Sequence, residues 1–142
     1  MKMKRQKFSD INVGDRACRT VEISPQLIDD FAQLSGDFSS IHMDPVAARE
    51  MGFNTRVAHG ALLTALVSSI LGMELPGRSG VVHSFEMAFK RPCYVDTVIT
   101  VSVEVLEKFS SVATLTLSVS IVDESSRLLA KGKVQSGLKI DG

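Results

Sequence analysis

The sequence lacks an excess of charge of either sign. Sixteen basic residues balance sixteen acidic ones among its 142 residues, so the formal net charge at pH 7 is +0. A chain without net charge has no overall field that would attract nucleic acid or an anionic membrane surface. We therefore expect neither of these partners, whereas a local basic pocket for a phosphorylated ligand is compatible with the balance.

Cysteine is also scarce, because the chain has only Cys18 and Cys93, which lie far apart and outside any metal-ligand or redox spacing. This usage is typical of a reduced, intracellular protein. No apolar run of a signal peptide follows the basic stretch 1–7, and the longest apolar stretch, 61–73, is too short for a membrane span. The sequence therefore predicts a cytoplasmic protein without a membrane segment.

Internal repeats, low-complexity segments and linkers are absent as well. Hydrophobic residues make up 44% of the chain and charged residues 23%, which is an ordinary globular balance. A chain of this length can bury a sizeable core. We therefore expect residues 1–142 to form a single domain.

End signals predict two helices in the first half of the chain. Residues 24–36 begin with a serine cap and a proline and end at a glycine. Apolar residues of this stretch share one helical face: Leu27, Ile28, Phe31 and Leu34. Residues 44–52 repeat the pattern with an Asp-Pro start and a glycine stop, and the polar segment 37–43 between the two helices has no clear pattern.

A third helix and a set of strands complete the predicted fold. Residues 61–73 are apolar on nearly every side, which is typical of a buried helix wrapped by a sheet. Period-two alternation predicts antiparallel strands over 15–23, 83–89, 99–105, 113–121 and 128–138. We therefore predict an α+β domain with the hot-dog fold, an antiparallel sheet wrapped around a central helix. Its open sheet edge favours pairing with a second copy, which would give a homodimer.

Asp37 and His42 are candidate proton-transfer residues on the irregular segment after the first helix. A carboxylate and an imidazole that share one water can remove one proton and donate another, as the addition of water to a double bond requires. The alternative is that Asp37 is a turn residue and His42 a surface loop residue.

Gly60 is a candidate binding residue, because it opens the predicted central helix after Val57-Ala58-His59. A free backbone N–H at a helix N-terminus stabilises negative charge, and a glycine lets a ligand approach closely. The alternative is that Gly60 only begins the helix in a tight space. We expect His59 to bond backbone near the helix start and His83 to lie in the core or in a pocket wall.

These segments resemble the MaoC-like dehydratases, which include the R-specific enoyl-CoA hydratases. The family motif Ser-Gly-Asp-x-Asn-Pro-(Leu/Ile)-His reads Ser-Gly-Asp-Phe-Ser-Ser-Ile-His at 35–42, and the Val-x-His-Gly motif is present at 57–60. The family's opening Phe-x-Asp-(Ile/Leu)-x-Val-Gly-Asp matches 8–15, and its Phe-x-x-Pro matches 89–92. The resemblance therefore covers nearly the whole chain.

The resemblance implies the hot-dog fold and the reversible syn hydration of trans-2-enoyl-CoA to R-3-hydroxyacyl-CoA. The substrate would be a thioester of CoA or of an acyl carrier protein, and no cofactor or metal is expected. Asp37 and His42 would be the catalytic residues, Gly60 the oxyanion donor through its N–H, and Ser68 a support for the catalytic Asp. Ser68 could equally be a core hydroxyl bonded to its own helix.

Two departures from the family pattern leave the loop geometry and the substrate open. Ser39-Ser40 stands where the family has Asn-Pro, and Asp96-Thr97 stands where it has Gly-Asp. A non-catalytic acyl-thioester-binding protein therefore remains one alternative. A hot-dog acyl-CoA thioesterase is another, although many of these enzymes place a carboxylate on the central helix, and 61–73 has none before Glu74.

Overall fold

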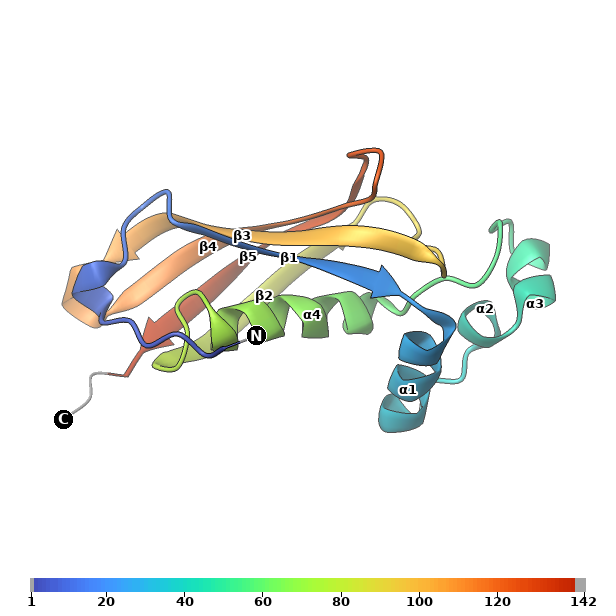
Figure 1. Ribbon diagram of the computed structural model, residues 1–142, viewed down its shortest axis with the longest axis horizontal. Helices are drawn as coiled ribbons and strands as arrows, with labels where there is room; N and C mark the ends of the chain where they lie inside the picture. The colour runs from blue at the N-terminus through green and yellow to red at the C-terminus, as the bar shows by residue number, and fades with distance from the viewer. Residues whose placement is uncertain (1, 140–142) are drawn as a thin grey trace.

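The computed structural model describes residues 2–139 and contains one five-stranded antiparallel sheet with a long helix against it (Figure 1). Residues 1 and 140–142 of the expected domain lie outside the described residues. The strands are β1 (Arg16–Ile23), β2 (Gly80–Phe89), β3 (Thr97–Phe109), β4 (Thr114–Val122) and β5 (Leu128–Leu138). They follow the order β1-β3-β4-β5-β2, which leaves β1 and β2 at the two edges. This arrangement confirms the predicted α+β fold.

The central helix α4 (Gly60–Met73) packs along one face of the sheet (Figure 1). Its buried residues are Leu62, Leu63, Leu66, Val67, Ile70 and Leu71. Within one chain the sheet covers this apolar helix on one side. The opposite face of α4 is exposed and carries small residues: Ala61, Ala65, Ser68 and Gly72.

Three shorter helices lie beyond one end of the sheet: α1 (Pro25–Ser35), α2 (Ser40–Met43) and α3 (Pro45–Glu50) (Figure 1). The predicted caps of α1 are confirmed, because the Ser24 hydroxyl accepts a hydrogen bond from the Leu27 N–H at 3.1 Å and Gly36 adopts a left-handed φ of 77°. The Asp44 carboxylate likewise accepts from the Val46 N–H at 2.9 Å at the start of α3. These caps fix both ends of the irregular segment between the helices.

Two local expectations need correction at this end of the molecule. The segment 37–43, for which no pattern was evident, contains α2. Leu34 lies on the apolar face of α1 but is 85% exposed. The described residues leave it uncovered because this end of α1 lies beyond the sheet (Figure 1).

His83 lies on the outer face of the sheet instead of in the core or in a pocket wall. A register shift between Val82 and Ser84 interrupts the pairing of β2 with β5, as in a β-bulge. The bulge reverses the alternation, so Val82 and Phe85 both pack against the core while His83 is exposed and covers Gly137. A one-residue irregularity of this kind is invisible to a strict period-two pattern.

The other strands follow most of the predicted alternation, although the pairing of β3 with β4 shifts after Val105 and adjacent residues are buried near both ends of β5. In β3 the buried residues are Ile99, Val101, Val103 and Val105. The turn at 123–126 joins β4 to β5, and the Asp123 carboxylate accepts from the Ser125 and Arg127 N–H groups, each at 2.9 Å. None of the helices within residues 2–139 is long and apolar enough to cross a membrane.

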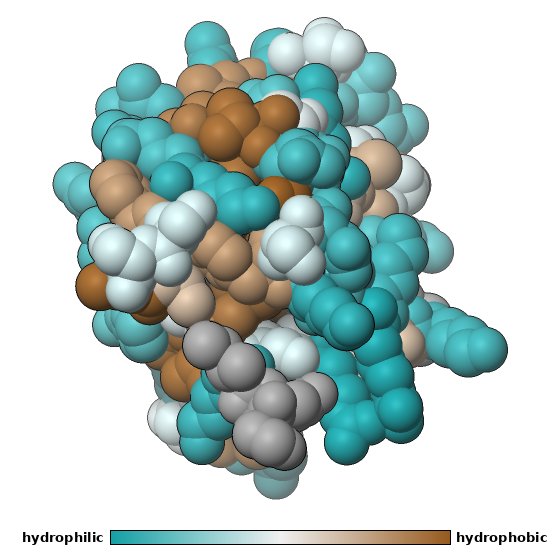
Figure 2. All heavy atoms as spheres, turned by 90° about the vertical axis from the view of Figure 1, so that its left-hand side faces the viewer, coloured by the Kyte–Doolittle hydropathy of each residue, from teal (hydrophilic) through white to brown (hydrophobic). Residues whose placement is uncertain are grey.

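The end of the sheet away from α1, α2 and α3 has a mixed surface. Figure 2 shows apolar side chains scattered among polar ones on this side. Val13, Phe109 and Val112, which lie near the two 3-10 turns η1 (Phe8–Asp10) and η2 (Ser110–Val112), are exposed. Asp37, His42 and His59 lie together at the other end of α4.

Candidate active site

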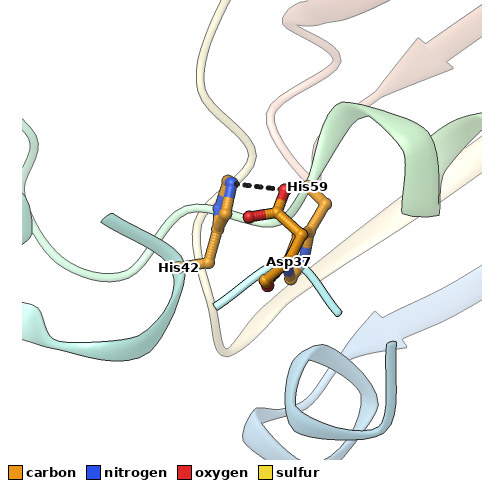
Figure 3. A group of neighbouring side chains, drawn as sticks. All are labelled: Asp37, His42 and His59. Atoms are coloured by element: carbon orange, nitrogen blue, oxygen red, sulfur yellow. Dashed lines mark hydrogen bonds and ion pairs between the residues drawn. The ribbon is translucent and has the colours of Figure 1, made fainter. Parts of the chain in front are cut away.

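Asp37, His42 and His59 form a close cluster where the irregular segment meets the start of α4 (Figure 3). Asp37 follows α1, His42 lies in α2, and His59 is the N-cap of α4. Their possible ligand atoms all lie within 4.8 Å of one another, and within residues 2–139 they are the one grouping of three or more such side chains. The structure thus brings the predicted Asp and His together and adds a second His.

The ring of His42 is oriented by the backbone. Its Nδ1 lies 2.5 Å from the Val57 carbonyl oxygen, and the residue is only 9% exposed. A carbonyl oxygen can only accept a hydrogen bond, so Nδ1 carries the proton in this arrangement and Nε2 keeps a free lone pair. His42 therefore presents a proton acceptor toward Asp37.

The two carboxylate oxygens of Asp37 have different neighbours. Oδ1 accepts hydrogen bonds from the Ser39 hydroxyl at 2.5 Å and from the Ser39 N–H at 3.0 Å. These hydrogen bonds, the hydroxyl first, hold the pKa of Asp37 below its ordinary value because they stabilise the charged form. Oδ2 faces His42, and the Asp37 side chain remains 46% exposed.

Asp37 Oδ2 and His42 Nε2 are 4.0 Å apart (Figure 3). This distance is too long for a direct hydrogen bond but is spanned by one water about 2.8 Å from each atom. Both atoms are acceptors, so such a water would donate one hydrogen to each of them. The pair can therefore hold a water molecule with its oxygen lone pairs free for reaction.

Gly60 shares a cavity of about 340 Å³ with His42. As the first residue of α4, Gly60 has an N–H without an acceptor inside the helix. A Cβ built at Gly60 would lie 2.9 Å from the ring of Phe89, so only glycine fits without moving that ring. The other lining residues are Phe53, Val57, Ala58, Leu63, Lys90, Arg91, Pro92 and Cys93.

Cys93 lies in this cavity wall but is unsuited to nucleophilic chemistry. It is 2% exposed, and burial raises the pKa of its thiol to about 11. A thiol with so high a pKa stays protonated near neutral pH, and the thiolate is the reactive form. Cys93 therefore adds no reactive nucleophile to the cavity.

Ser68 is not joined to the cluster in this structure. It lies on the exposed face of α4, and neither Asp37 nor the backbone of α4 shares a hydrogen bond with it among the described residues. The hydroxyls that bond their own helix are instead Thr64, to the Gly60 carbonyl at 3.2 Å, and Ser69, to the Leu66 carbonyl at 2.8 Å. The supporting role of Ser68 stays a prediction.

Sequence reasoning missed two contacts at the site. His59 donates from Nε2 to the Asp37 carbonyl oxygen at 2.9 Å, where a bond near the helix start was expected. The Ser39 hydroxyl donates a hydrogen bond to the Asp37 carboxylate. The geometry of this loop was not predicted, because Ser39-Ser40 replaces the Asn-Pro of the family motif. The pattern Asp-x-Ser is a local turn signal that could have indicated the second contact. No local pattern indicates the first, which spans 22 residues.

A divalent cation at this place would use the same three side chains. Two of the four imidazole nitrogens already donate hydrogen bonds to backbone carbonyls. The atoms left to bind a metal ion are the carboxylate oxygens of Asp37, His42 Nε2 and His59 Nδ1. His59 Nδ1 is buried away from solvent. The atoms that face the accessible gap are thus those of Asp37 and His42, an arrangement that suits proton transfer through water.

Comparison with known proteins gives a consistent result. The MaoC like domain matches residues 10–124. The (R)-specific enoyl-CoA hydratase of Aeromonas caviae is 35% identical over 108 residues, 75% of this chain and 81% of that protein. The 3-hydroxybutyryl-CoA dehydratase of Methylorubrum extorquens is 36% identical over 100 residues, 70% of this chain and 64% of that protein.

A solved structure resembles the chain as a whole. The (R)-hydratase from Aeromonas caviae, which is involved in PHA biosynthesis, aligns with a TM-score of 0.87 at 30% identity. The alignment covers 91% of this chain and 98% of that one. The residues that the family model matches, 10–124, include β1 to β4 and the helices α1 to α4.

The first prediction concerns Ser39. Ser39→Ala removes the hydroxyl that does most to hold down the pKa of Asp37, so we expect this pKa to rise toward its ordinary value. Carboxyl ¹³C NMR titration of wild type and variant measures the shift. Asp123 is an internal control, because its lowered pKa depends on Arg127 and Ser125 and should not move. An unchanged pKa for Asp37 would contradict the assigned contact.

Proposed function

The chain belongs to the MaoC-like domain family, and on that premise we propose that it hydrates trans-2-enoyl-CoA reversibly to R-3-hydroxyacyl-CoA by syn addition. Asp37 and His42 are the catalytic pair in this proposal. The observation that carries it is the 4.0 Å gap between two acceptor atoms, Asp37 Oδ2 and His42 Nε2, beside the cavity that contains Gly60. The names of two relatives, an enoyl-CoA hydratase and a 3-hydroxybutyryl-CoA dehydratase, describe the two directions of such a reaction.

In the proposed mechanism one water bridges Asp37 and His42 and attacks the β-carbon of the enoyl thioester. His42 takes the proton of the water on Nε2, because imidazole is the stronger base of the two residue types and the pKa of Asp37 is lowered. The carboxylate of Asp37 then stabilises the positive ring. The new C–O bond displaces the π electrons of the double bond toward the thioester oxygen.

The Gly60 N–H would stabilise the resulting enolate. It begins α4, so the N–H points out of the helix end and the helix dipole favours negative charge there. When the thioester carbonyl re-forms, the α-carbon takes the proton from His42 Nε2. Water and proton come from the same cluster, so both add to one face of the substrate, which is syn addition.

Two alternatives have less support. A thioesterase that uses a carboxylate on the central helix does not fit, because α4 contains none and Glu74 lies at its C-cap. A purely binding role does not explain why the backbone orients His42 with its free nitrogen toward Asp37. The hydratase proposal accounts for both features.

We also propose that residues 1–142 form one domain and act as a homodimer in the cytoplasm. The edge strand β2 has no fully buried residue and offers its open side for pairing with a second copy. The bare face of α4 is a second surface that such a dimer could cover. Cys18 and Cys93 are both free thiols, in line with a reducing compartment.

Light scattering of the purified protein tests the oligomer. We expect twice the mass of one chain at micromolar concentration, because pairing along β2 would satisfy backbone groups that a monomer leaves to solvent. A dilution series to nanomolar concentration is the control for a weak association. A monomer throughout the micromolar range would contradict the homodimer.

Asp37→Asn and His42→Gln test the catalytic pair. Each change should lower kcat for crotonyl-CoA hydration about a hundredfold or more, and the double variant should lose little beyond either single one, since both residues act on one water. The assay follows loss of the enoyl thioester absorbance and, separately, release of free CoA thiol. Asp30→Asn on the exposed side of α1 is the matched control and should keep full activity.

Three results would count against this assignment. Additive losses in the double variant would mean two independent roles. Near-wild-type hydration in either single variant would remove that residue from the mechanism. Release of CoA without hydration would favour the thioesterase.

Gly60→Val tests the oxyanion donor. The N–H remains, but the added carbons enter the space beside the Phe89 ring, so we expect turnover to collapse through blocked access. Phe89 is half exposed and can move, so the fold should survive. Gly72→Val on the same helix is the control, because nothing in the chain lies within 4 Å of its built Cβ. Light scattering of this variant checks that the proposed dimer is unchanged. Thermal unfolding and crotonyl-CoA hydration are measured on one sample, and a folded, fully active Gly60→Val protein would contradict the proposal.

A further inference from the structure

We propose that His59 is a positioning residue, which holds the Asp37 backbone through its Nε2–H and the plane of the His42 ring through stacking. This inference rests on the proposed function, because it assigns a task toward the catalytic pair of that reaction. His59 makes no contribution to proton transfer in this scheme. It acts through the two residues that do.

The first contact of His59 is with the backbone of Asp37. Nε2 lies 2.9 Å from the Asp37 carbonyl oxygen, and among residues 2–139 this is the one hydrogen bond that the carbonyl receives. The Asp37 side chain itself is half exposed and sits on a segment that follows the left-handed Gly36. The bond from His59 therefore ties an exposed loop to the start of the buried helix α4.

The second contact is with the ring of His42. The two imidazoles stack with centroids 3.9 Å apart and an interplanar angle of 27° (Figure 3). The bond from His42 Nδ1 to the Val57 carbonyl holds one edge of the ring, and a turn about the Cβ–Cγ bond would break it. A flat neighbour against the ring face resists the same turn, so that Nε2 stays directed toward Asp37.

The surroundings of His59 favour one tautomer. The residue is 2% exposed, and Phe31 packs on it with ring centroids 4.9 Å apart. The acceptor at Nε2 is a carbonyl oxygen, so the proton lies on Nε2. Nδ1 is buried and has no hydrogen-bond partner among the described residues. A proton there would be a buried donor without an acceptor, which is unfavourable.

These contacts give His59 a geometric task at a site that depends on distance. The gap between Asp37 Oδ2 and His42 Nε2 admits one water, and a shift of either group by about 1 Å typically costs on the order of a hundredfold in rate. The residue that fixes both sides of this gap is adjacent to Gly60, the proposed oxyanion donor. The His59 side chain thus connects the loop that carries Asp37, the ring of His42 and the first turn of α4.

Two substitutions of His59 separate its two contacts. His59→Gln can place an amide N–H near the position of Nε2 but loses the ring, whereas His59→Phe keeps a flat ring and loses the donor. We expect His59→Phe to lower kcat for crotonyl-CoA hydration about tenfold to a hundredfold with KM nearly unchanged, because the loop is misplaced while the cavity remains. His59→Gln should recover a large part of this loss.

A second experiment tests whether His59 acts on kcat through the proposed catalytic pair. In an Asp37→Asn protein, adding His59→Phe should cause little further loss of kcat, since the residue that it positions is already inactive. A purely structural role would instead lower the melting temperature in parallel with activity and add to the loss in either background. Wild-type kcat in a folded His59→Phe protein, or full additivity, would overturn the proposal.

Long-range ¹H–¹⁵N NMR of the wild-type protein tests the geometry without any variant. The expected signal is the Nε2–H tautomer of His59 at neutral pH. An Nδ1–H tautomer would overturn the inference even if His59→Phe fails to fold. Loss of activity in Asp37→Asn and His42→Gln together with a silent His59→Phe would leave the proposed function standing and reject this inference alone.

Discussion

Packing of α4 against one face of the sheet is the constraint on which the rest of the structure depends. Six apolar side chains of this helix are buried, and burying each such side chain stabilises the fold by roughly 1.5–3 kcal/mol. A helix held along its length also has a fixed first turn. Gly60 and its N-cap His59 are therefore placed by the core, although Gly60 lines the cavity at its edge and His59 stacks on His42 in the cavity wall.

Backbone carbonyl groups then determine the orientation of both imidazoles. The Val57 carbonyl binds Nδ1 of His42, and the Asp37 carbonyl binds Nε2 of His59. Because a carbonyl only accepts, each ring has one defined protonated nitrogen and one free nitrogen. The free nitrogen of His42 faces the gap beside Asp37, whereas that of His59 is buried. Two histidines side by side are in this way suited to different tasks, one to chemistry and one to position.

Sequence patterns predicted the parts of this structure that depend on local regularity. Alternation predicted the strands, the caps predicted α1 and α3, and the irregular segment 37–43 predicted that Asp37 and His42 point to one place. The bulge at His83 was missed because one extra residue in a strand leaves no mark on composition. The bond from His59 to Asp37 was missed because it joins segments 22 residues apart, and such contacts depend on how the elements pack. The sequence also does not indicate which face of α4 is bare, because apolar character alone does not say which side of a helix the sheet covers.

The replacement of Asn-Pro by Ser39-Ser40 changes the local restraints on the loop between α1 and α2. Ser39 is the N-cap of α2, but its hydroxyl bonds Asp37 and makes no cap bond to the helix. Ser40 occupies the first helical position, where proline is well tolerated because no N–H is needed there. Serine at this position leaves φ free to vary, so local covalent geometry restrains the loop less than a proline would. The restraint must then come from contacts made after folding, and the bond from His59 to the Asp37 carbonyl and the stacking of His59 on His42 both reach this segment from the start of the buried helix. The less rigid the segment around Asp37, the more the gap between Asp37 and His42 depends on these contacts.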